Sequence, residues 1–461
     1  VLRDQPWSFR SASLKPLFPS SRRRSMLATG LVRAALPHTS PGRFLAKMLV
    51  QRTRNLSISS STASLGRRGG VLRAGRVARP VPYTHSMVVT MGLKTGIVGL
   101  PNVGKSTLFN AMVENGKAES ANYPFCTIEP NVGLVLVPDG RLAVLSDLSK
   151  SQKSIPTTVE FVDIAGLVKG ASQGEGLGNK FLSHIREVDV VVQVVRCFED
   201  ENIVHVNGQV DPLMDIDTIN IELGLRDIEQ MEQRKERLKK GRVKDKAQQD
   251  AEALENEALD KLLAELGEGK VAREVELSAE EMEVVKPLCL LTMKPVIYAA
   301  NVGEDDLANE GADNTHVQAL RAKAAQEGAK VVIVSAAVEA ELKELDPPDR
   351  AEYLEALGVN EGGLGTLIRS TYDTLGLRTY FTSGEKETRA WTIKAGMTAP
   401  QAAGVIHSDF ERGFICADTV AYDDFVEAKT LSACKEAGRL RQEGKEYVVQ
   451  EGDIMEFKFN V

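Results

Sequence analysis

From about residue 94 onward, short and mainly apolar runs alternate with amphipathic stretches. Such runs are typical of strands that are buried on both faces, and helical stretches between them allow the strands to run parallel. The pattern therefore predicts an α/β fold with a doubly wound, mostly parallel sheet. The candidate strands are residues 95–98, 159–162, 190–195, 295–300 and 331–334.

Residues 214–285, between the third and fourth candidate strands, have a different and highly charged pattern. Apolar residues recur there at helical spacing in two stretches, which predicts an inserted helical coiled-coil hairpin. These residues are Ile216, Ile219 and Leu223 in the first stretch and Leu259, Leu262, Leu263 and Leu266 in the second. Ser278 and Glu281 have the spacing of a capping box, which predicts that a further helix begins there.

The middle of this insertion is basic. A solvated hairpin tip explains such a charge run, since exposed helices commonly carry charge, and contact with a polyanion is the alternative. The basic residues cluster near Gly241 and are Arg234, Lys235, Arg237, Lys239, Lys240, Arg242, Lys244 and Lys246.

After Leu375 the pattern changes to short β-type runs around one helical stretch that Pro400 can begin. We expect strands at residues 389–393, 414–420, 447–449 and 454–459, which together predict a small α+β module. Residues 377–461 carry 11 basic and 14 acidic residues, so charge alone does not mark an RNA-binding surface.

The charge is distributed unevenly along the 461 residues. Residues 1–86 carry 16 Lys and Arg against one acid, Asp4; because the whole chain has 57 basic and 64 acidic residues, the rest carries 41 and 63. An Arg- and Ser-rich leader with almost no acids is typical of an organelle transit peptide, so we expect import into a plastid or mitochondrion. One alternative is that residues before Met87 or Met91 are an untranslated extension, in which case the protein would be cytoplasmic. Another is that the leader is a basic arm that binds nucleic acid.

Composition excludes several other classes. A hydrophobic fraction of 43% with 26% charged residues is not that of a disordered chain, and no apolar run of about 18 residues could span a bilayer. We therefore expect no membrane partner. The five cysteines are scattered and form no CxxC pair, which indicates neither a disulfide scaffold nor a zinc site.

A phosphate-binding sequence follows the first candidate strand. Residues 99–106, GLPNVGKS, fit G-x-x-x-x-G-K-[ST] between a strand and a helical run, which is the context that this pattern requires. Backbone N–H groups of such a loop surround an anion; Lys105 would contact the β- and γ-phosphates, and the Ser106 hydroxyl would bind Mg²⁺. The expected nucleotide contacts in this loop are Asn102, Val103, Gly104, Lys105, Ser106 and Thr107.

Two further elements have the order of a nucleotide switch. Asp163-Ile164-Ala165-Gly166 ends an apolar strand and matches D-x-x-G, so that Asp163 can hold Mg²⁺ while the Gly166 amide contacts the γ-phosphate. Thr127 lies between the two sequences and can complete the Mg²⁺ coordination when triphosphate is bound. We expect Ser106, Thr127 and Asp163 to be the metal ligands.

The predicted base-binding segment departs from guanine specificity. Residues 301–304, NVGE, stand where a guanine site has N-K-x-D, in which the Asp accepts two hydrogen bonds from the base. Glu304 is one methylene longer and Val302 removes the lysine, so we expect ATP to be preferred over GTP. Ser335, Ala336 and Ala337 end the next strand and should converge with Asn301 at the carboxyl edge of the sheet.

The candidate for promoting hydrolysis is a histidine. Leu167 follows Gly166 where Ras-like switches carry the glutamine that orients water, so hydrolysis should be slow without another residue or a partner. His205, near the end of a sheet strand, could take that role as an acid or base. The alternative is a histidine held by packing and one backbone bond.

Several segments together resemble the YchF-type Obg-like ATPase family. They are residues 96–106, 125–131 (FCTIEPN), 162–171 (VDIAGLVKGA), 389–393 (RAWTI) and 399–404 (APQAAG). The resemblance covers about residues 90–461, and it implies a P-loop domain, a coiled-coil insertion and a C-terminal TGS domain of β-grasp type. It also implies Mg²⁺-dependent ATP hydrolysis with tolerance for GTP, and association with ribosomes.

The same resemblance implies particular residue roles. His205 matches the family histidine that is implicated in hydrolysis, and Asn102 matches a P-loop asparagine that binds K⁺ in related potassium-stimulated NTPases. We expect a partner on the large ribosomal subunit and RNA contacts through the TGS domain and the insertion. The expected domains are residues 1–86 (leader), 91–212 with 287–375 (nucleotide-binding), 213–286 (insertion) and 376–461 (TGS).

Four hypotheses for the function follow. The first is a slow, partner-stimulated ATPase switch on an organellar ribosome. The second is a nucleotide-gated module that binds RNA or a ribosome and whose turnover is incidental, and the third is a GTP-specific GTPase. A small-molecule kinase shares only the P-loop and would need an acceptor pocket that D-x-x-G with Asn-x-x-Glu does not provide.

Overall fold

A computed structural model describes residues 93–120, 132–164, 185–205, 208–240 and 245–460. Its first sheet has six strands in the order β2-β4-β1-β5-β6-β7. Neighbouring strands are parallel, except that β2 and β4 are antiparallel. The strands are β1 (Lys94–Val98), β2 (Val132–Leu136), β4 (Thr158–Asp163), β5 (Val190–Arg196), β6 (Val296–Asn301) and β7 (Lys330–Val334). The mostly parallel α/β sheet that the sequence predicts is confirmed.

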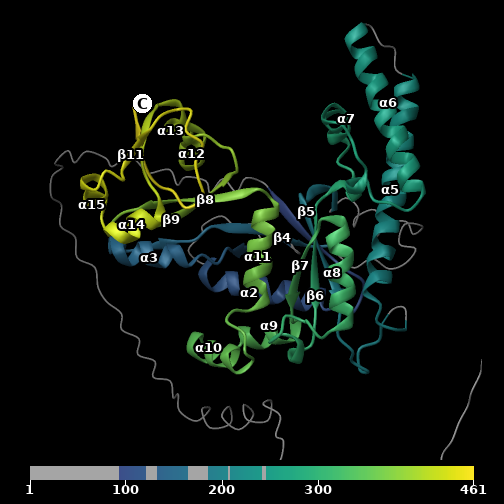
Figure 1. Ribbon diagram of the computed structural model, residues 1–461, viewed down its shortest axis with the longest axis horizontal. Coiled ribbons are helices and arrows are strands. Elements are labelled where there is room, and N and C mark those ends of the chain that lie inside the picture. The colour runs from purple at the N-terminus through teal and green to yellow at the C-terminus, as the bar shows by residue number, and fades with distance from the viewer. Residues whose placement is uncertain (1–92, 121–131, 165–184, 206–207, 241–244, 461) are drawn as a thin grey trace, which may run out of the picture. The chain divides into compact units, whose positions relative to one another are not determined.

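Helices cover both faces of this sheet (Figure 1). The helices α2 (Lys105–Ser120) and α11 (Gly363–Thr374) pack on one face, and α5 (Pro212–Lys240) and α8 (Thr315–Glu327) pack on the other. Because β1 has β4 on one side and β5 on the other, the loop after β1 lies where the strand order reverses. Doubly wound sheets bind their ligands at this point.

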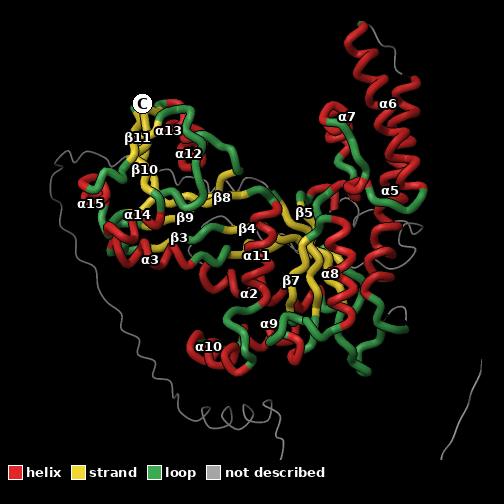
Figure 2. Tube along the Cα trace, viewed as in Figure 1, coloured by secondary structure: helices red, strands yellow, loops and turns green. Residues whose placement is uncertain are grey.

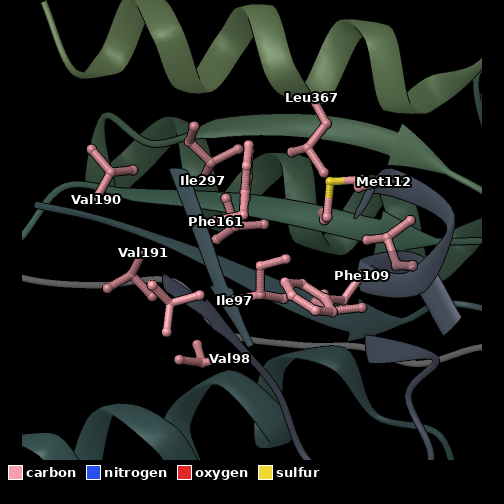
Figure 3. Close-up of a cluster of buried hydrophobic side chains, with 14 of the residues drawn as sticks. Ile97, Val98, Phe109, Met112, Phe161, Val190, Val191, Ile297 and Leu367 are labelled. Atoms are coloured by element: carbon pink, nitrogen blue, oxygen red, sulfur yellow. The ribbon is translucent and has the colours of Figure 1, made fainter. Parts of the chain in front are cut away.

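The core lies between these layers, and its composition explains the parallel strands. All seven residues of β5, VVVQVVR, are buried. A strand without an exposed face can exist only where both faces of the sheet are covered, and each buried Val, Leu or Ile stabilises the fold by about 1.5–3 kcal/mol. Figure 3 shows Ile97, Phe161 and Ile297 of the strands packed near Leu367 of α11.

The insertion consists of α5, α6 (Lys246–Gly267) and α7 (Ala279–Val285). The helices α5 and α6 run side by side (Figure 1), and their shared core contains Met231, Leu259 and Leu262. The capping box at α7 is confirmed: Ser278 Oγ accepts from Glu281 N at 3.1 Å, and Glu281 Oε2 accepts from Ser278 N at 2.6 Å.

The C-terminal part forms a second, mixed sheet in the order β11-β10-β12-β8-β9-β3 (strands yellow in Figure 2). Its strands are β3 (Ser154–Ile155), β8 (Leu377–Ser383), β9 (Thr388–Lys394), β10 (Phe414–Val420), β11 (Arg441–Glu443) and β12 (Ile454–Phe459). The prediction of a strand at residues 447–449 is wrong, because the pairing there is limited to one isolated bridge between Val448 and Thr398. Tyr447 N bonds instead to Gly444 O within a turn, so the pairing does not extend.

One segment from the first half of the chain belongs to this second sheet. The helix α3 (Gly140–Ser149) and strand β3 lie between β2 and β4 in sequence, yet β3 pairs in parallel with β9. Leu142 and Leu145 of α3 are buried in the same cluster as Phe381 and Val420. The range 91–212, expected for the nucleotide-binding domain, therefore contains a segment that packs with the C-terminal domain.

The remaining helices are short: α9 (Ala336–Lys343), α10 (Pro347–Ala356), α12 (Ala399–Ile406), α13 (Ser408–Arg412), α14 (Tyr422–Ala428) and α15 (Leu431–Glu436). The 3₁₀ turns are η2 (Ala272–Glu274), η3 (Lys286–Leu288), η4 (Leu291–Met293) and η5 (Glu304–Asp306). The helix α12 carries Pro400 in its first turn and is capped by Thr398 and Gln401. Within the described ranges, no helix is both long and apolar enough to cross a membrane.

Candidate functional site

The loop between β1 and α2 has the backbone geometry of a phosphate cradle. Gly104 has φ +90°, a conformation that residues with a side chain rarely adopt, and a Cβ there would collide with the Asn301 amide. Asn102 also has a positive φ, of +64°. A Cβ on Gly99 would lie 2.9 Å from Val194 O, so the loop needs both glycines to pass this close to the sheet.

Asn301, at the end of β6, connects three separate segments. Its Nδ2 donates to Val103 O of the loop at 2.8 Å, and its Oδ1 accepts from Ala336 N, at the start of α9, at 2.9 Å. Asn301 is 3% exposed, so both hydrogen bonds are shielded from water. The structure thus brings together the P-loop, the end of β6 and the residues Ser335 and Ala336 that sequence reasoning placed there.

Lys105 and Asp163 meet at the start of α2 and the end of β4. Lys105 Nζ donates a hydrogen bond to Asp163 Oδ1, and the two side chains are only 9% and 16% exposed. Ser106 and Thr107 follow Lys105 in the first turn of α2 and are exposed. This arrangement places one cation, one carboxylate and two hydroxyl groups at the mouth of the cradle. A phosphate would compete with Asp163 for the lysine.

The segment expected to bind the base has two different environments. Val302 is 2% exposed and packs with Val317 and Leu320, while its N donates to Val334 O at 2.9 Å. Glu304 begins η5 and is exposed. Val302 therefore contributes to the core, whereas Glu304 is accessible to a ligand.

His205 is buried beside the P-loop. Its Nε2 lies 3.0 Å from Asp215 Oδ2 in the first turn of α5, and both side chains are 4% exposed. The preceding residue, Val204, accepts a hydrogen bond through its carbonyl from Asn102 Nδ2 at 3.1 Å. Sequence reasoning proposed packing and a single backbone bond as the alternative for this histidine, and the structure gives it a carboxylate partner.

Asp215, the carboxylate partner of His205, is itself buried. The thiol of Cys197 is completely buried, and burial, followed by the charges of Asp215 and Asp306, raises its pKa to about 12. The thiol therefore stays protonated at neutral pH.

Two of the expected site residues, Thr127 and Gly166, lie outside the described residues, as does Leu167. Two functional candidates were missed. Asp215 is one, and the second is Arg196 at the end of β5, which is 1% exposed. A charged residue that ends an otherwise apolar strand was a signal for Arg196, but no sequence pattern connects Asp215 to His205.

The fold and this loop define a P-loop nucleotide-binding protein. Residues 94–236 match a family profile described as a 50S ribosome-binding GTPase, and residues 377–460 match one described as a protein of unknown function, DUF933.

Curated relatives and a solved structure define the family more closely. The chain is 56% identical over 372 residues to "Ribosome-binding ATPase YchF" of Bacillus subtilis and 54% identical to the protein of that name in Escherichia coli O157:H7, covering 80% of this chain and 100% of each relative. The structure of the Schizosaccharomyces pombe YchF GTPase superposes with a TM-score of 0.72 at 41% identity, covering 80% of this chain and 98% of that one. This chain belongs to the YchF family.

Proposed function

We propose that this chain is a ribosome-binding ATPase that hydrolyses ATP slowly and accepts GTP less well. The observation that carries the proposal is that Asn301 bonds to the P-loop and to the start of α9, while Glu304 stands where a guanine site needs aspartate. The relatives from Bacillus subtilis and Escherichia coli carry the name ribosome-binding ATPase, which supports the same activity here.

The preference for adenine rests on the base-reading segment. Val302 is buried in the core, so no lysine lies over the base there, and the longer Glu304 cannot accept the two guanine hydrogen bonds from the position of an aspartate. The fission-yeast relative is called a GTPase, so the names of the relatives differ on the base. A direct comparison of ATP and GTP is therefore the decisive measurement.

The donor set at the cradle fits a magnesium ion. Ser106 offers a hydroxyl and Asp163 a carboxylate, and hard oxygen ligands with phosphate oxygens are what Mg²⁺ prefers. When bound, Mg²⁺ neutralises phosphate charge, and Asp163 would exchange its bond to Lys105 for the metal. Thr127 is the further proposed Mg²⁺ ligand.

Asn102 is the candidate ligand for K⁺. Its Nδ2 donates a hydrogen bond to Val204 O, so its Oδ1 is the side-chain atom that could bind the ion.

Hydrolysis needs a group that acts on water. His205 is our candidate for a general base or acid, because it lies one residue from the P-loop contact at Val204. Lys105 and the Gly166 amide are the proposed contacts to the γ-phosphate. Partner binding would have to accelerate turnover, because the leucine after Gly166 cannot orient water.

The proposed partner is the ribosome, with the large subunit as the expected contact, and RNA could be bound through the insertion and the C-terminal domain. In the insertion, Arg234 and Lys235 pair with Glu255 and Asp260 across the hairpin. These two cations therefore hold the helices together. The cations closer to the tip, among them Arg237 and Lys239, remain the better candidates for a polyanion.

The location of the protein is a separate proposal. The net charge of +15 over residues 1–86 supports import into a plastid or mitochondrion, and a cytoplasmic protein is the alternative. The full chain and residues 91–461, each fused to a fluorescent protein, would show whether the basic segment directs import. Identical cytoplasmic signals from both fusions would remove this proposal.

The function is tested by nucleotide competition and hydrolysis assays on the full chain. We expect ADP to accumulate from ATP faster than GDP from GTP, and ribosomes to accelerate the reaction. Lys105→Ala should abolish triphosphate binding, because Lys105 is the cation at the cradle. The control is Lys343→Ala on α9, outside the cradle, which should bind ATP like the wild type.

Three results would count against this function. Exclusive GTP hydrolysis would establish a GTPase, and unchanged ATP affinity in the Lys105 variant would show that the cradle is elsewhere. Nucleotide-dependent ribosome binding without turnover would favour the binding module.

A further inference from the structure

Arg196 is a buried arginine, and within the described part of the chain the hydrogen bonds of its guanidinium go to backbone carbonyls. It ends β5, next to Asn301 of β6, and its side chain is almost inaccessible to solvent. Burying a charged group is unfavourable unless its hydrogen-bonding atoms are satisfied. The guanidinium must therefore have compensating partners, and it finds them in the backbone of one loop.

Residues 198–204, which we name the support loop, fold around this guanidinium. Arg196 Nε donates to Phe198 O at 3.1 Å, one terminal nitrogen donates to Ile203 O at 2.9 Å, and the other donates to Asp200 O at 3.2 Å. The guanidinium carbon also lies 4.6 Å from the centre of the Phe198 ring. One planar group thus fixes three carbonyls of a seven-residue loop.

The support loop leads directly to the candidate catalytic residues. Its last residue, Val204, accepts a hydrogen bond from Asn102 of the P-loop. The next residue is His205, which Asp215 holds at its Nε2. A shift of the support loop would therefore move the P-loop contact and the histidine together.

We propose that Arg196 is a positioning residue for nucleotide hydrolysis, which fixes the support loop so that His205 is held beside the P-loop. Only arginine offers donors in a rigid planar fork that can reach three carbonyls at once. Lysine has a compact ammonium group and would leave some of these buried carbonyls without a donor. The inference rests on the proposed ATPase activity and adds a residue to it.

The experiment measures ATP turnover and nucleotide binding in Arg196→Lys, His205→Ala and the double variant, all in the full chain. We expect kcat to fall at least about 10-fold in Arg196→Lys, because a small misplacement of a catalytic group can lower the rate by about 10²-fold. The KM for ATP and the affinity for ADP should stay within about 3-fold of the wild-type values, because the residue does not contact the nucleotide. If Arg196 acts through His205, the double variant should be no slower than His205→Ala.

The matched control is Arg350→Lys. Arg350 also donates to backbone carbonyls, those of Leu342 and Leu345, but it lies on α10 and has no contact with the support loop. Its replacement should leave kcat unchanged. Amide hydrogen exchange then reports the structural consequence: residues 198–204 should exchange faster in Arg196→Lys, and the strands of the second sheet should not.

The following outcomes would overturn the proposed role of Arg196 or the function on which it rests. Additive losses in the double variant, or full turnover in His205→Ala, would show that Arg196 does not act by positioning His205. If Arg196→Lys does not fold, Asp215→Asn removes the carboxylate that holds His205 at its Nε2, and it must reduce kcat without adding to His205→Ala. A wild-type protein that hydrolyses no ATP would remove the proposed function, whereas unchanged exchange of the support loop in a folded variant would remove this inference alone.

Discussion

The helical insertion and the C-terminal domain contact the rest of the chain through different chemistry. The insertion is anchored by buried carboxylates. Asp227 of α5 is fully buried and accepts from Leu291 N and Thr292 N, both at 2.8 Å, and from Thr292 Oγ1 at 2.6 Å. Glu327 of α8 accepts from Arg273, which follows the hairpin, at 2.9 Å.

Side-chain polar contacts between the C-terminal domain and residues 140–155, the segment from the first half of the chain that packs with it, are mainly between neutral hydroxyl groups. Thr388 Oγ1 of β9 lies 2.7 Å from Ser151 Oγ, and Ser383 Oγ of β8, which is 2.7 Å from Thr388 Oγ1, lies 2.8 Å from Ser149 Oγ. The main charged contact across this seam is that of Arg141 with Glu451, at 2.6 Å, where both side chains are at least 30% exposed.

This difference has a consequence for each attachment. Burial raises the pKa of Asp227, whose carboxylate is therefore costly to keep charged. Burial also opposes ionisation of Glu327, but hydrogen bonds from Tyr298 and Arg273 outweigh it and lower the pKa of that group. The insertion should respond to pH, whereas hydroxyl groups do not titrate and the seam at Thr388 should respond little.

The largest expected effect comes from matched leucines in the two regions. Leu145→Ala in α3 and Leu262→Ala in α6 each remove a leucine that is 0% exposed, and each should reduce the free energy of unfolding by about 3 kcal/mol. Because Leu145 packs with Phe381 and Val420, its loss should open the buried apolar cluster of the C-terminal domain to solvent.

Hydrogen exchange read by mass spectrometry separates the two variants. Leu145→Ala should accelerate exchange in β8 and β10, and Leu262→Ala in α5 and α6. The attachment of α3 to the second sheet would be contradicted if Leu145→Ala left the C-terminal strands protected and loosened only the first sheet.

A smaller effect is expected from pH. The pKa of Glu327 is lower in the folded protein than its ordinary value of 4.5, so its contribution to stability is complete above pH 4.5 and is lost as the pH falls through the folded value. The raised pKa of Asp227 acts in the opposite direction, with stability falling as the pH rises above 3.8. Comparing wild type with Glu327→Gln cancels the effect of Asp227.

Urea unfolding at several values between pH 6 and pH 3 measures this contribution. The wild type should lose more stability on acidification than Glu327→Gln does. Parallel pH profiles for the two proteins would mean that Glu327 does not anchor the insertion through its charge.

The smallest expected effect is at the hydroxyl seam. Thr388→Val keeps the shape of the side chain but removes its contacts to Ser151 and Ser383, which should cost about 1 kcal/mol at any pH. Thr371→Val is the matched control, because Thr371 is equally buried and bonds only to Leu367 O within its own helix. An equal loss in both variants would show that the seam adds nothing to the attachment.

Much of the fold could be predicted because its signals are local. Gly104 and Lys105 occur in a fixed sequence pattern, and the apolar run of β5 requires a covered sheet. The capping box at Ser278 involves residues three positions apart. In each case the residues that determine the structure are neighbours in sequence, so the pattern is sufficient.

Other parts of the site could not be predicted. Lys105 is bonded to Asp163, 58 positions away, and Asn102 donates to Val204 O, 102 positions away. Arg196 is recognisable in the sequence as a charged residue at the end of a mainly apolar strand, but that pattern does not show that the support loop closes over it. Their partners are chosen by chain folding, which brings distant groups to one edge of the sheet.

The sequence by itself determined the nucleotide-binding class, the central strands and the helical insertion, because glycine conformation and apolar periodicity act over a few residues. Only the tertiary structure decided that α3 and the two-residue β3 join the C-terminal sheet and that Asp215 holds His205. So short a strand carries no periodicity of its own. It becomes a strand because β9 presents unpaired backbone groups at the edge where β3 lies.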